Sequence, residues 1–211
     1  MDEKILQYIG SHIDPEPAPL ARLYRNTHLT MLYPHMCTDH LQGRLLTMLT
    51  RIIAPRTAVE IGTFSGYSAL CIAEGLADDN CRLHTFEIDD EHENFIRNHF
   101  EQTEYGRRIR LHIGDARQLL PHAVGQPVDM AYVDANKRQY VDYYELLLPL
   151  MAQHGVIIAD NTLWAGKVAD PDCHDAQTKA IRDFNDHVAA DNRVERVILP
   201  LRDGLTLIRK K

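Results

Sequence analysis

The chain has 211 residues, of which 45% are hydrophobic and 25% charged, the proportions of an ordinary globular protein. Its formal net charge of -7 at pH 7 argues against a nucleic-acid partner, and no apolar run approaches the roughly 20 residues that a membrane helix needs. Four cysteines without CxxC spacing and a charged start of the chain argue against a disulfide framework, a zinc site and a signal peptide, so we expect a cytoplasmic protein without a membrane partner.

The first quarter of the chain is expected to be helical. Apolar residues recur at helical spacing in three segments, and a run of prolines separates the first segment from the second. A proline also follows the second segment and the third, where it ends each helix. The expected helices cover residues 2–10, residues 20–32 and a stretch that begins at a cap on Thr38 or Asp39 and ends before Pro55.

From Thr57 onward, predicted strands and helices alternate, which is typical of a parallel sheet with helices on both faces. The last two strands are separated by only residues 200–203, too few for a crossover helix, so this pair must be antiparallel. The expected strands are residues 57–61, 82–87, 110–113, 130–133, 156–159, 194–199 and 204–209, and the expected helices are residues 65–76, 90–105, 116–120, 141–151 and 175–190.

We therefore expect a single α/β domain. Within it, residues 1–54 form a helical segment that covers a site or contributes to a subunit interface, and residues 55–211 form the core with the sheet. Ligands of open α/β sheets bind beyond the carboxyl ends of the strands, where five consecutive predicted strands here end in polar or small residues. We expect one cleft lined by Glu60, Gly62, Glu87, Asp89, Gly114, Asp115, Ala116, Asp134, Asn136, Lys137, Asp160 and Asn161.

The turn after the first strand, Glu60-x-Gly62-x-x-x-Gly66, differs from the dinucleotide fingerprint G-x-G-x-x-G. Glu60 replaces the first glycine, and its carboxylate would repel a pyrophosphate and attract a cationic or amino-bearing ligand. Glu87 ends the next strand, where a carboxylate can accept hydrogen bonds from ribose hydroxyls. A turn that needs glycine only for its backbone angles, and a solvated strand end at Glu87, remain open as alternatives.

Three oxygen-bearing side chains, Asp134, Asp160 and Asn161, follow the fourth and fifth strands and would converge if these strands are neighbours. Oxygen ligands suit Mg²⁺, Ca²⁺ or Mn²⁺ rather than zinc. The alternative is that Asp134 caps a helix and that Asp160 and Asn161 form an Asx-turn.

Lys137 lies three residues after Asp134, on the rim of the same cleft. A lysine pKa of about 10.4 makes it a poor base unless nearby cationic groups lower that pKa. Trp164, the only tryptophan, is either an aromatic wall of a substrate pocket or a core or interface anchor.

At these residues the chain resembles the cation-dependent O-methyltransferases of the caffeoyl-CoA and catechol type. The resemblance runs from about Leu20 to the end of the chain, and the combination of Asp-Asn-Thr-Leu-Trp with the Asp-x-x-Lys spacing is its most specific part. The matching segments are residues 59–68, residues 133–137 with Tyr140 and Tyr143, residues 160–164 with Gly166, and residues 203–207.

The resemblance implies a Rossmann-like methyltransferase domain whose seven-stranded, mostly parallel sheet has an antiparallel last strand. It also implies S-adenosylmethionine and a divalent cation as cofactors, and a homodimer. Residue by residue, it places Glu60, Gly62, Thr63 and Ser68 at the methionine end of S-adenosylmethionine, Glu87 at the ribose, Asp115 and Ala116 at the adenine, and Met36 and Thr38 in a segment that closes over the cofactor. It makes Asp134, Asp160 and Asn161 the metal ligands, and Asp134 and Asn136 further cofactor contacts. The catalytic residues are then Lys137, as general base, and Asp134, and the substrate contacts are Trp164 and Lys137.

The chain departs from the plant caffeoyl-CoA enzymes at three positions. Asn136 and Gln42 stand where those enzymes have acidic residues, and Ala165 replaces an asparagine that contacts their substrate. A glutamate of the catechol enzymes has no match. The resemblance therefore carries over the methyl-transfer residues but leaves the substrate open.

The reaction that the resemblance implies is methylation of one hydroxyl of a small vicinal diphenol. The cation, most simply Mg²⁺, chelates the two hydroxyls, Lys137 takes the proton, and the oxyanion attacks the sulfonium methyl. One alternative is an NAD(P)-dependent oxidoreductase, against which Glu60 and the terminal hairpin argue. The other is a catalytically weak, cofactor-binding regulatory protein, for which the changes at Asn136 and Gln42 argue.

Overall fold

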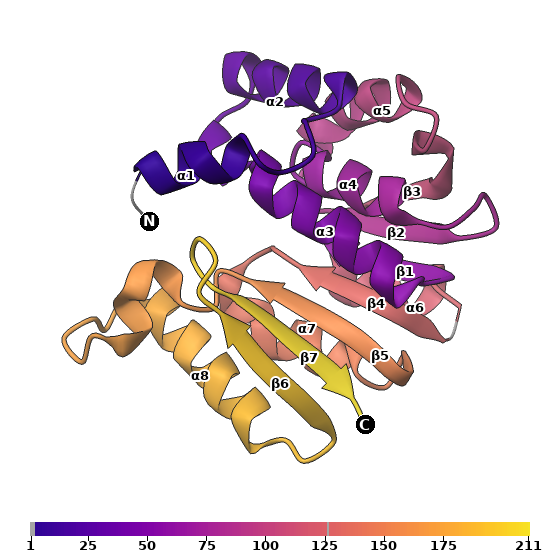
Figure 1. Ribbon diagram of the computed structural model, residues 1–211. Helices are drawn as coiled ribbons and strands as arrows, with labels where there is room; N and C mark the ends of the chain where they lie inside the picture. The colour runs from indigo at the N-terminus through magenta and orange to yellow at the C-terminus, as the bar shows by residue number, and fades with distance from the viewer. Residues whose placement is uncertain (1–2, 126) are drawn as a thin grey trace.

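The structure is a computed structural model that describes residues 3–125 and 127–211. Its described residues contain a seven-stranded sheet with the order β3-β2-β1-β4-β5-β7-β6 (Figure 1). Strands β1 to β5 are parallel, and β7 is antiparallel to both of its neighbours, which confirms the predicted fold class and the antiparallel terminal pair. The strands are β1 (Thr57–Ile61), β2 (Arg82–Glu87), β3 (Ile109–Ile113), β4 (Val128–Val133), β5 (Met151–Asp160), β6 (Val194–Leu199) and β7 (Leu205–Lys210).

Helices cover both faces of this sheet (Figure 1). One face packs on α2 (Ala18–Thr30), α3 (His40–Ile53), α4 (Tyr67–Gly75) and α5 (Glu93–Glu101), and the other on α6 (Ala116–Ala123), α7 (Tyr140–Leu147) and α8 (Ala176–Ala190). Short 3-10 turns are η1 (Pro34–Met36), η2 (Asp90–His92), η3 (Gly106–Arg108), η4 (Lys137–Gln139) and η5 (Trp164–Ala169).

Successive side chains of a strand point to opposite faces of the sheet. Because helices cover both faces, the side chains of the central strands are buried on both sides. In β1, Ala58 packs in the apolar cluster beneath α3 and α4, whereas Val59 packs in the cluster beneath α7 and α8. The strand therefore reads as a nearly continuous apolar run, into which the buried Glu60 is inserted.

Two of the predicted helices end four residues before the predicted position. The helix expected over residues 141–151 ends at Leu147, and Met151 begins β5, because Met151 pairs with Val128 at the start of the β4–β5 ladder. The helix expected over residues 90–105 begins as η2 and continues as α5, which ends at Glu101, and η3 lies beyond the expected helix.

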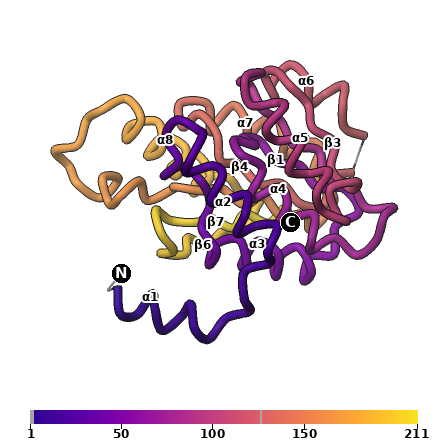
Figure 2. The backbone as a smooth tube through the Cα atoms, turned by 90° about the horizontal axis from the view of Figure 1, so that it is seen from above, coloured from indigo at the N-terminus to yellow at the C-terminus, as the bar shows by residue number. Residues whose placement is uncertain are grey.

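The first helix, α1 (Glu3–Gly10), lies at the margin of the molecule in both views and buries none of its residues (Figure 1, Figure 2). By contrast, α2 and α3 contribute Leu20, Leu23 and Leu46 to the core. Ala54, in a left-handed conformation, caps the end of α3, and only residues 55 and 56 separate it from β1. Among the residues that the structure describes, no helix has both the length and the apolar character needed to cross a membrane.

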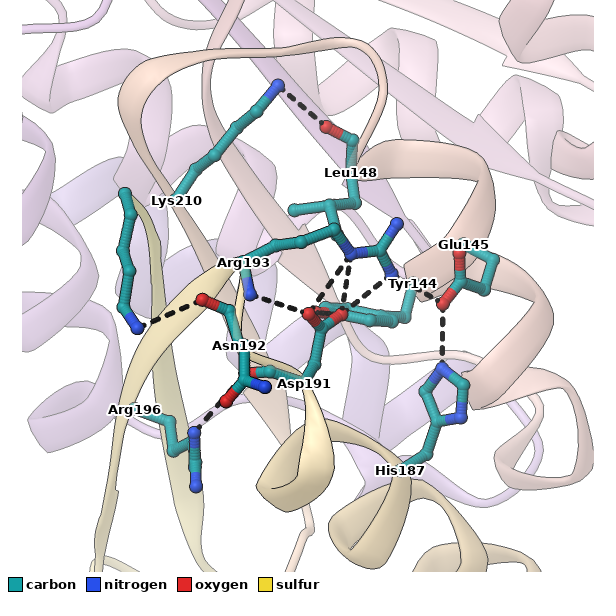
Figure 3. A network of polar contacts seen from close by, with 10 residues as sticks. Tyr144, Glu145, Leu148, His187, Asp191, Asn192, Arg193, Arg196 and Lys210 are labelled. Carbon is teal, nitrogen blue, oxygen red and sulfur yellow. Dashed lines mark hydrogen bonds and ion pairs between the residues drawn. The ribbon is translucent and has the colours of Figure 1, made fainter.

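A polar network fixes α7, α8 and the start of β6 together at the amino ends of the strands (Figure 3). Asp191 accepts hydrogen bonds from the Tyr144 hydroxyl at 2.8 Å and from the Arg193 guanidinium, which holds the pKa of Asp191 well below its ordinary value. Glu145 accepts from His187 Nε2 at 2.7 Å and from Arg193 at 2.9 Å. The network lies away from the carboxyl ends of the parallel strands, where the predicted site lies.

Candidate active site

The carboxyl ends of β3, β2, β1, β4 and β5 lie side by side, as the sequence predicted for residues that share one cleft. The strand ladder continues into the loops, because Gly62 N donates to Phe86 O at 3.0 Å, Asp134 N to Ile61 O at 2.9 Å and Gly114 N to Glu87 O at 2.7 Å. The chain order reverses between β1 and β4, and a crevice at such a point is the usual ligand site of an open α/β sheet.

Gly62 lies where the β1 and β4 loops meet. Its φ is +98°, and a Cβ atom there would lie 2.0 Å from the carbonyl oxygen of Asp134. No residue with a side chain fits this position. The backbone geometry is therefore sufficient to require glycine here, and the same close approach brings Glu60 and Asp134 to neighbouring strand ends.

Glu60 is completely buried, and its two carboxylate oxygens have different surroundings. Oε2 accepts from the hydroxyl of Thr85, which also bonds the hydroxyl of Thr63, whereas Oε1 has no hydrogen-bond partner in the described chain. Burial raises the pKa of Glu60 to about 8, and the charges of Asp134 and Glu87 add to this rise; the nearby hydroxyls of Ser68 and Thr85, of which only that of Thr85 makes a hydrogen bond to Glu60, oppose it. An ammonium group is the kind of ligand that would satisfy Oε1 and stabilise the charged carboxylate.

Glu87 is also buried, which makes the solvated-strand-end alternative wrong. Its Oε2 accepts from Phe64 N at 2.6 Å and its Oε1 from Asp89 N at 3.0 Å. Each oxygen keeps acceptor capacity for a further donor, such as a hydroxyl. Glu87 thus joins the loop after β1 to the loop after β2 at the edge of the crevice.

The residues assigned to the adenine lie at the start of α6. Asp115 caps this helix through Arg117 N at 2.9 Å and pairs with the Arg117 guanidinium, which lowers the pKa of Asp115, while Ala116 is buried. Two surface hollows, both lined by Thr103 and Glu104 after the end of α5, are lined by none of the predicted site residues.

The N-terminal segment reaches the glycine turn through Cys37, whose Sγ lies 3.5 Å from Ser65 Oγ. Met36 precedes it and is 52% exposed, whereas Thr38 is buried. Asp39, rather than Thr38, caps α3, because its side chain accepts from Gln42 N at 2.9 Å.

Lys137 pairs with Asp134 in the crevice. Its Nζ donates to Asp134 Oδ1 at 2.8 Å and to the Tyr140 hydroxyl at 2.7 Å, and that hydroxyl lies 3.0 Å from the carbonyl oxygen of Asp160. Burial lowers the pKa of Lys137, but Asp134 and Tyr140 outweigh this effect and raise it overall. The expected lowering of this pKa therefore depends on cationic ligands. The alternative that Asp134 caps the next helix is wrong, because Asn136 caps η4.

Asp160 is held by three hydrogen bonds. Oδ2 accepts from Gln42 Nε2 at 2.5 Å and from the Tyr132 hydroxyl at 2.8 Å, and Oδ1 accepts from Asn161 N at 2.7 Å. The bond to the next residue in the chain is not that of an Asx-turn, so this alternative is also wrong. Burial raises the pKa of Asp160 to about 6, and the charge of Asp134 adds to this rise.

The sequence interpretation missed the roles of Gln42 and Tyr132. Gln42 stood out only as a departure from the plant enzymes, and nothing local in the sequence ties it to a carboxylate 118 residues away. Tyr132 reaches Asp160 because it pairs with Ile158 in the β4–β5 ladder, and Asp160 lies two positions after Ile158, on the same face of β5.

The oxygen donors of Asp134, Asp160 and Asn161 fit a hard divalent cation, although only two of the three are carboxylates. Among residues 3–125 and 127–211, no three His, Cys, Asp or Glu side chains form a metal-binding group, so the Asn161 amide would have to be the third protein ligand. Asp160 already uses three of the roughly four lone-pair positions of a carboxylate. A cation bound here would rely most on Asp134 and would relieve its repulsion with Asp160.

Trp164 begins η5 after β5 and is half-buried against the apolar cluster beneath α7 and α8. Its backbone N and that of Leu163 both donate to Asp203 O in the β6–β7 turn, at 3.1 Å and 2.7 Å. The turn can approach so closely because Gly204 has φ +89°, and a Cβ atom there would overlap Leu163. Part of the Trp164 side chain thus packs on the core, and the rest is exposed to solvent.

Comparison with known proteins gives consistent matches over nearly the whole chain. The O-methyltransferase family model matches residues 10–211. The chain is 36% identical to catechol O-methyltransferase domain-containing protein 1 of Mus musculus, over 79% of this chain and 64% of that protein, and 30% identical to probable caffeoyl-CoA O-methyltransferase 2 of Dictyostelium discoideum, over 99% and 92%. The structure of the O-methyltransferase TomG from Streptomyces achromogenes in complex with SAM matches with a TM-score of 0.91 at 28% identity, over 100% of both chains.

Proposed function

Because the chain belongs to the O-methyltransferase family, we propose that it transfers a methyl group from S-adenosylmethionine to one hydroxyl of a small vicinal diphenol, with a divalent cation at the ends of β4 and β5. Family membership confirms the resemblance read from the sequence and the expectation of an O-methyltransferase enzyme. The donor, the cation and the acceptor are the proposal.

One observation supports the donor most. The unpartnered Oε1 of the buried Glu60 lies at the end of β1, next to the strand end that carries the Asp134–Lys137 pair. S-adenosylmethionine carries an ammonium group that Glu60 would accept and a sulfonium methyl that would lie toward the pair. Glu87 has acceptor capacity for the ribose hydroxyls on the neighbouring strand. The SAM complex of the related TomG supports the same assignment.

The acceptor hydroxyl would lie between the donor and the carboxylates of β4 and β5. A divalent cation on Asp134, Asp160 and Asn161 would supply Lewis-acid stabilisation of the phenolate. Lys137 would take the hydroxyl proton at Nζ, once the charge of Asp134 no longer raises its pKa. Asp134 orients Lys137 through the 2.8 Å hydrogen bond, and Tyr140 orients it from the opposite side.

The acceptor is proposed as a small phenolic molecule. The exposed part of Trp164 would form an aromatic wall beside the cleft. The net charge of -7 gives no general attraction for the phosphates of a coenzyme A ester. A simple catechol or a flavonoid-like phenol therefore fits better.

We also propose that the chain forms a homodimer. Ile5 and Tyr8 of α1 are 51% and 65% exposed, although the helix is amphipathic and could bury one face. Light scattering after size-exclusion chromatography would test this proposal, and a monomer at all concentrations would contradict it.

The deciding experiment is a methyl-transfer assay with labelled S-adenosylmethionine and a panel of vicinal diphenols, with Mg²⁺ or with EDTA. We expect turnover of at least one diphenol that depends on Mg²⁺, and none with matched monophenols. Turnover that EDTA leaves unchanged would contradict the metal assignment. Binding of S-adenosylhomocysteine without turnover of any phenol would favour the regulatory alternative, and NADH binding by fluorescence titration would favour the oxidoreductase.

A further inference from the structure

The loop from Asn161 to Asp175, called here the acceptor loop, has a backbone that needs outside support. It joins β5 to α8 and projects beside α8 (Figure 1). Asn161, Trp164 and Ala165 have φ values of 57°, 47° and 53°, in the left-handed region that side chains disfavour. Such conformations persist only where the surrounding structure fixes them.

Arg182 of α8 supplies this support to the second half of the loop. Its guanidinium donates to four loop carbonyl oxygens: Nε to Val168 at 2.9 Å, Nη1 to Cys173 at 2.7 Å, and Nη2 to Lys167 at 2.8 Å and to Asp170. Arginine has five N–H donors in a planar fork, and no other side chain could serve so many divergent acceptors at once.

The first half of the loop is held from two directions. Asn185, also on α8, donates through Nδ2 to Thr162 O at 2.8 Å, and Asp203 O accepts from the backbone of Leu163 and Trp164. The far end of α8 is fixed in turn by the network around Asp191 (Figure 3). The helix therefore acts as a rigid support for the acceptor loop.

We propose that Arg182 is a positioning residue that holds the acceptor loop, and with it Trp164, as a preformed wall of the acceptor site. The inference rests on the proposed function, in which Trp164 faces the phenol. Every hydrogen bond that the structure gives to Arg182 ends on a loop carbonyl, so the residue acts through the loop. Its effect falls on the acceptor side, because Glu60 and Glu87 lie on β1 and β2.

Two substitutions separate the hydrogen bonds from the charge. Arg182→Met keeps an unbranched side chain but removes every donor, and Arg182→Lys keeps the charge with a single donor atom. The matched control is Arg82→Met, because Arg82 also donates to backbone carbonyl oxygens, those of Asp79 and Cys81, but at the start of β2 and away from α8.

Trp164 makes the test direct, since it is the only tryptophan and its fluorescence reports on the loop alone. We expect Arg182→Met to red-shift the emission and to increase quenching by acrylamide, with Arg182→Lys intermediate and Arg82→Met like the wild type. In steady-state assays, we expect the KM for the diphenol to rise about tenfold in Arg182→Met, as after loss of one good interaction, while the KM for S-adenosylmethionine is unchanged.

Wild-type quenching and a wild-type acceptor KM in both Arg182 variants would overturn the proposal, and so would equal changes in both KM values. If Arg182→Met does not fold, as judged by circular dichroism, Arg182→Lys carries the same comparison. If the wild type methylates no phenol, the proposed function fails, and the fluorescence experiment still decides whether Arg182 holds the loop.

Discussion

Glu60→Gln gives the sharpest test of the site. The buried, charged carboxylate of Glu60 should lower the free energy of unfolding at high pH, and it should also increase the affinity for the cofactor. The pKa of Glu60 is raised from 4.5 to about 8, so the folded state holds more protons than the unfolded state between these pH values. The contribution of Glu60 to stability is therefore fully present below pH 4.5 and is lost as the pH rises through about 8. The rise in pKa corresponds to an upper bound of about 5 kcal/mol.

The glutamine variant removes this pH dependence at a smaller cost. Its amide NH₂ would take the place of the unpartnered Oε1 and remain a buried donor without an acceptor, which costs about 1–3 kcal/mol. We therefore expect Glu60→Gln to be less stable than the wild type at pH 5 and about 2–4 kcal/mol more stable at pH 9.

Urea denaturation at several pH values measures this difference, with the exposed Glu91→Gln as control. Glu91→Gln should follow the wild type at each pH. Calorimetry should show S-adenosylhomocysteine binding to Glu60→Gln weakened about tenfold or more, since a hydrogen bond to a charged group is worth about 1.5–3 kcal/mol. A stability difference that does not vary with pH would refute the reasoning on burial, and unchanged binding would refute the role of Oε1.

Three further substitutions test the other parts of the site. Asp160→Asn should abolish Mg²⁺-dependent turnover and weaken Mn²⁺ binding measured by electron paramagnetic resonance, whereas binding equal to that of the wild type would remove Asp160 from the metal ligands. Lys137→Arg keeps the positive charge, but the arginine cannot give up a proton and so cannot act as a base. We expect kcat to fall about 100-fold or more, with the KM for S-adenosylmethionine unchanged. A normal kcat would leave Lys137 only as the ion-pair partner of Asp134. Gly62→Ala should lose at least about 2 kcal/mol of unfolding free energy, measured in urea, because its Cβ would overlap the Asp134 carbonyl, whereas Gly10→Ala meets no atom within 4 Å and should be neutral.

The exact residues that bond across the site depend on contacts between distant segments. Nothing near Gln42 predicts its hydrogen bond to Asp160, and nothing near Arg182 predicts that it meets four carbonyl oxygens. The end of α7 at Leu147 was mispredicted for the same reason, because apolar residues of a helix and of a buried strand look alike until a neighbouring strand pairs with one of them. The pKa of a side chain also depends on distant packing. Lys137 lies three residues after Asp134 in the sequence, but whether its pKa is raised or lowered depends on burial, Asp134 and Tyr140 together.

The sequence by itself determined the order of strands and helices, the antiparallel terminal pair and the edge of the sheet where polar residues gather. These follow from periodicity, short connections and glycine positions, which act over a few residues. Only the tertiary structure decided that Asn136 rather than Asp134 caps η4, that Glu87 is buried, and that one oxygen of Glu60 is left without a partner. Burial and hydrogen-bond partners arise from packing between elements, and packing assigns each polar atom its neighbours only once the whole chain is folded.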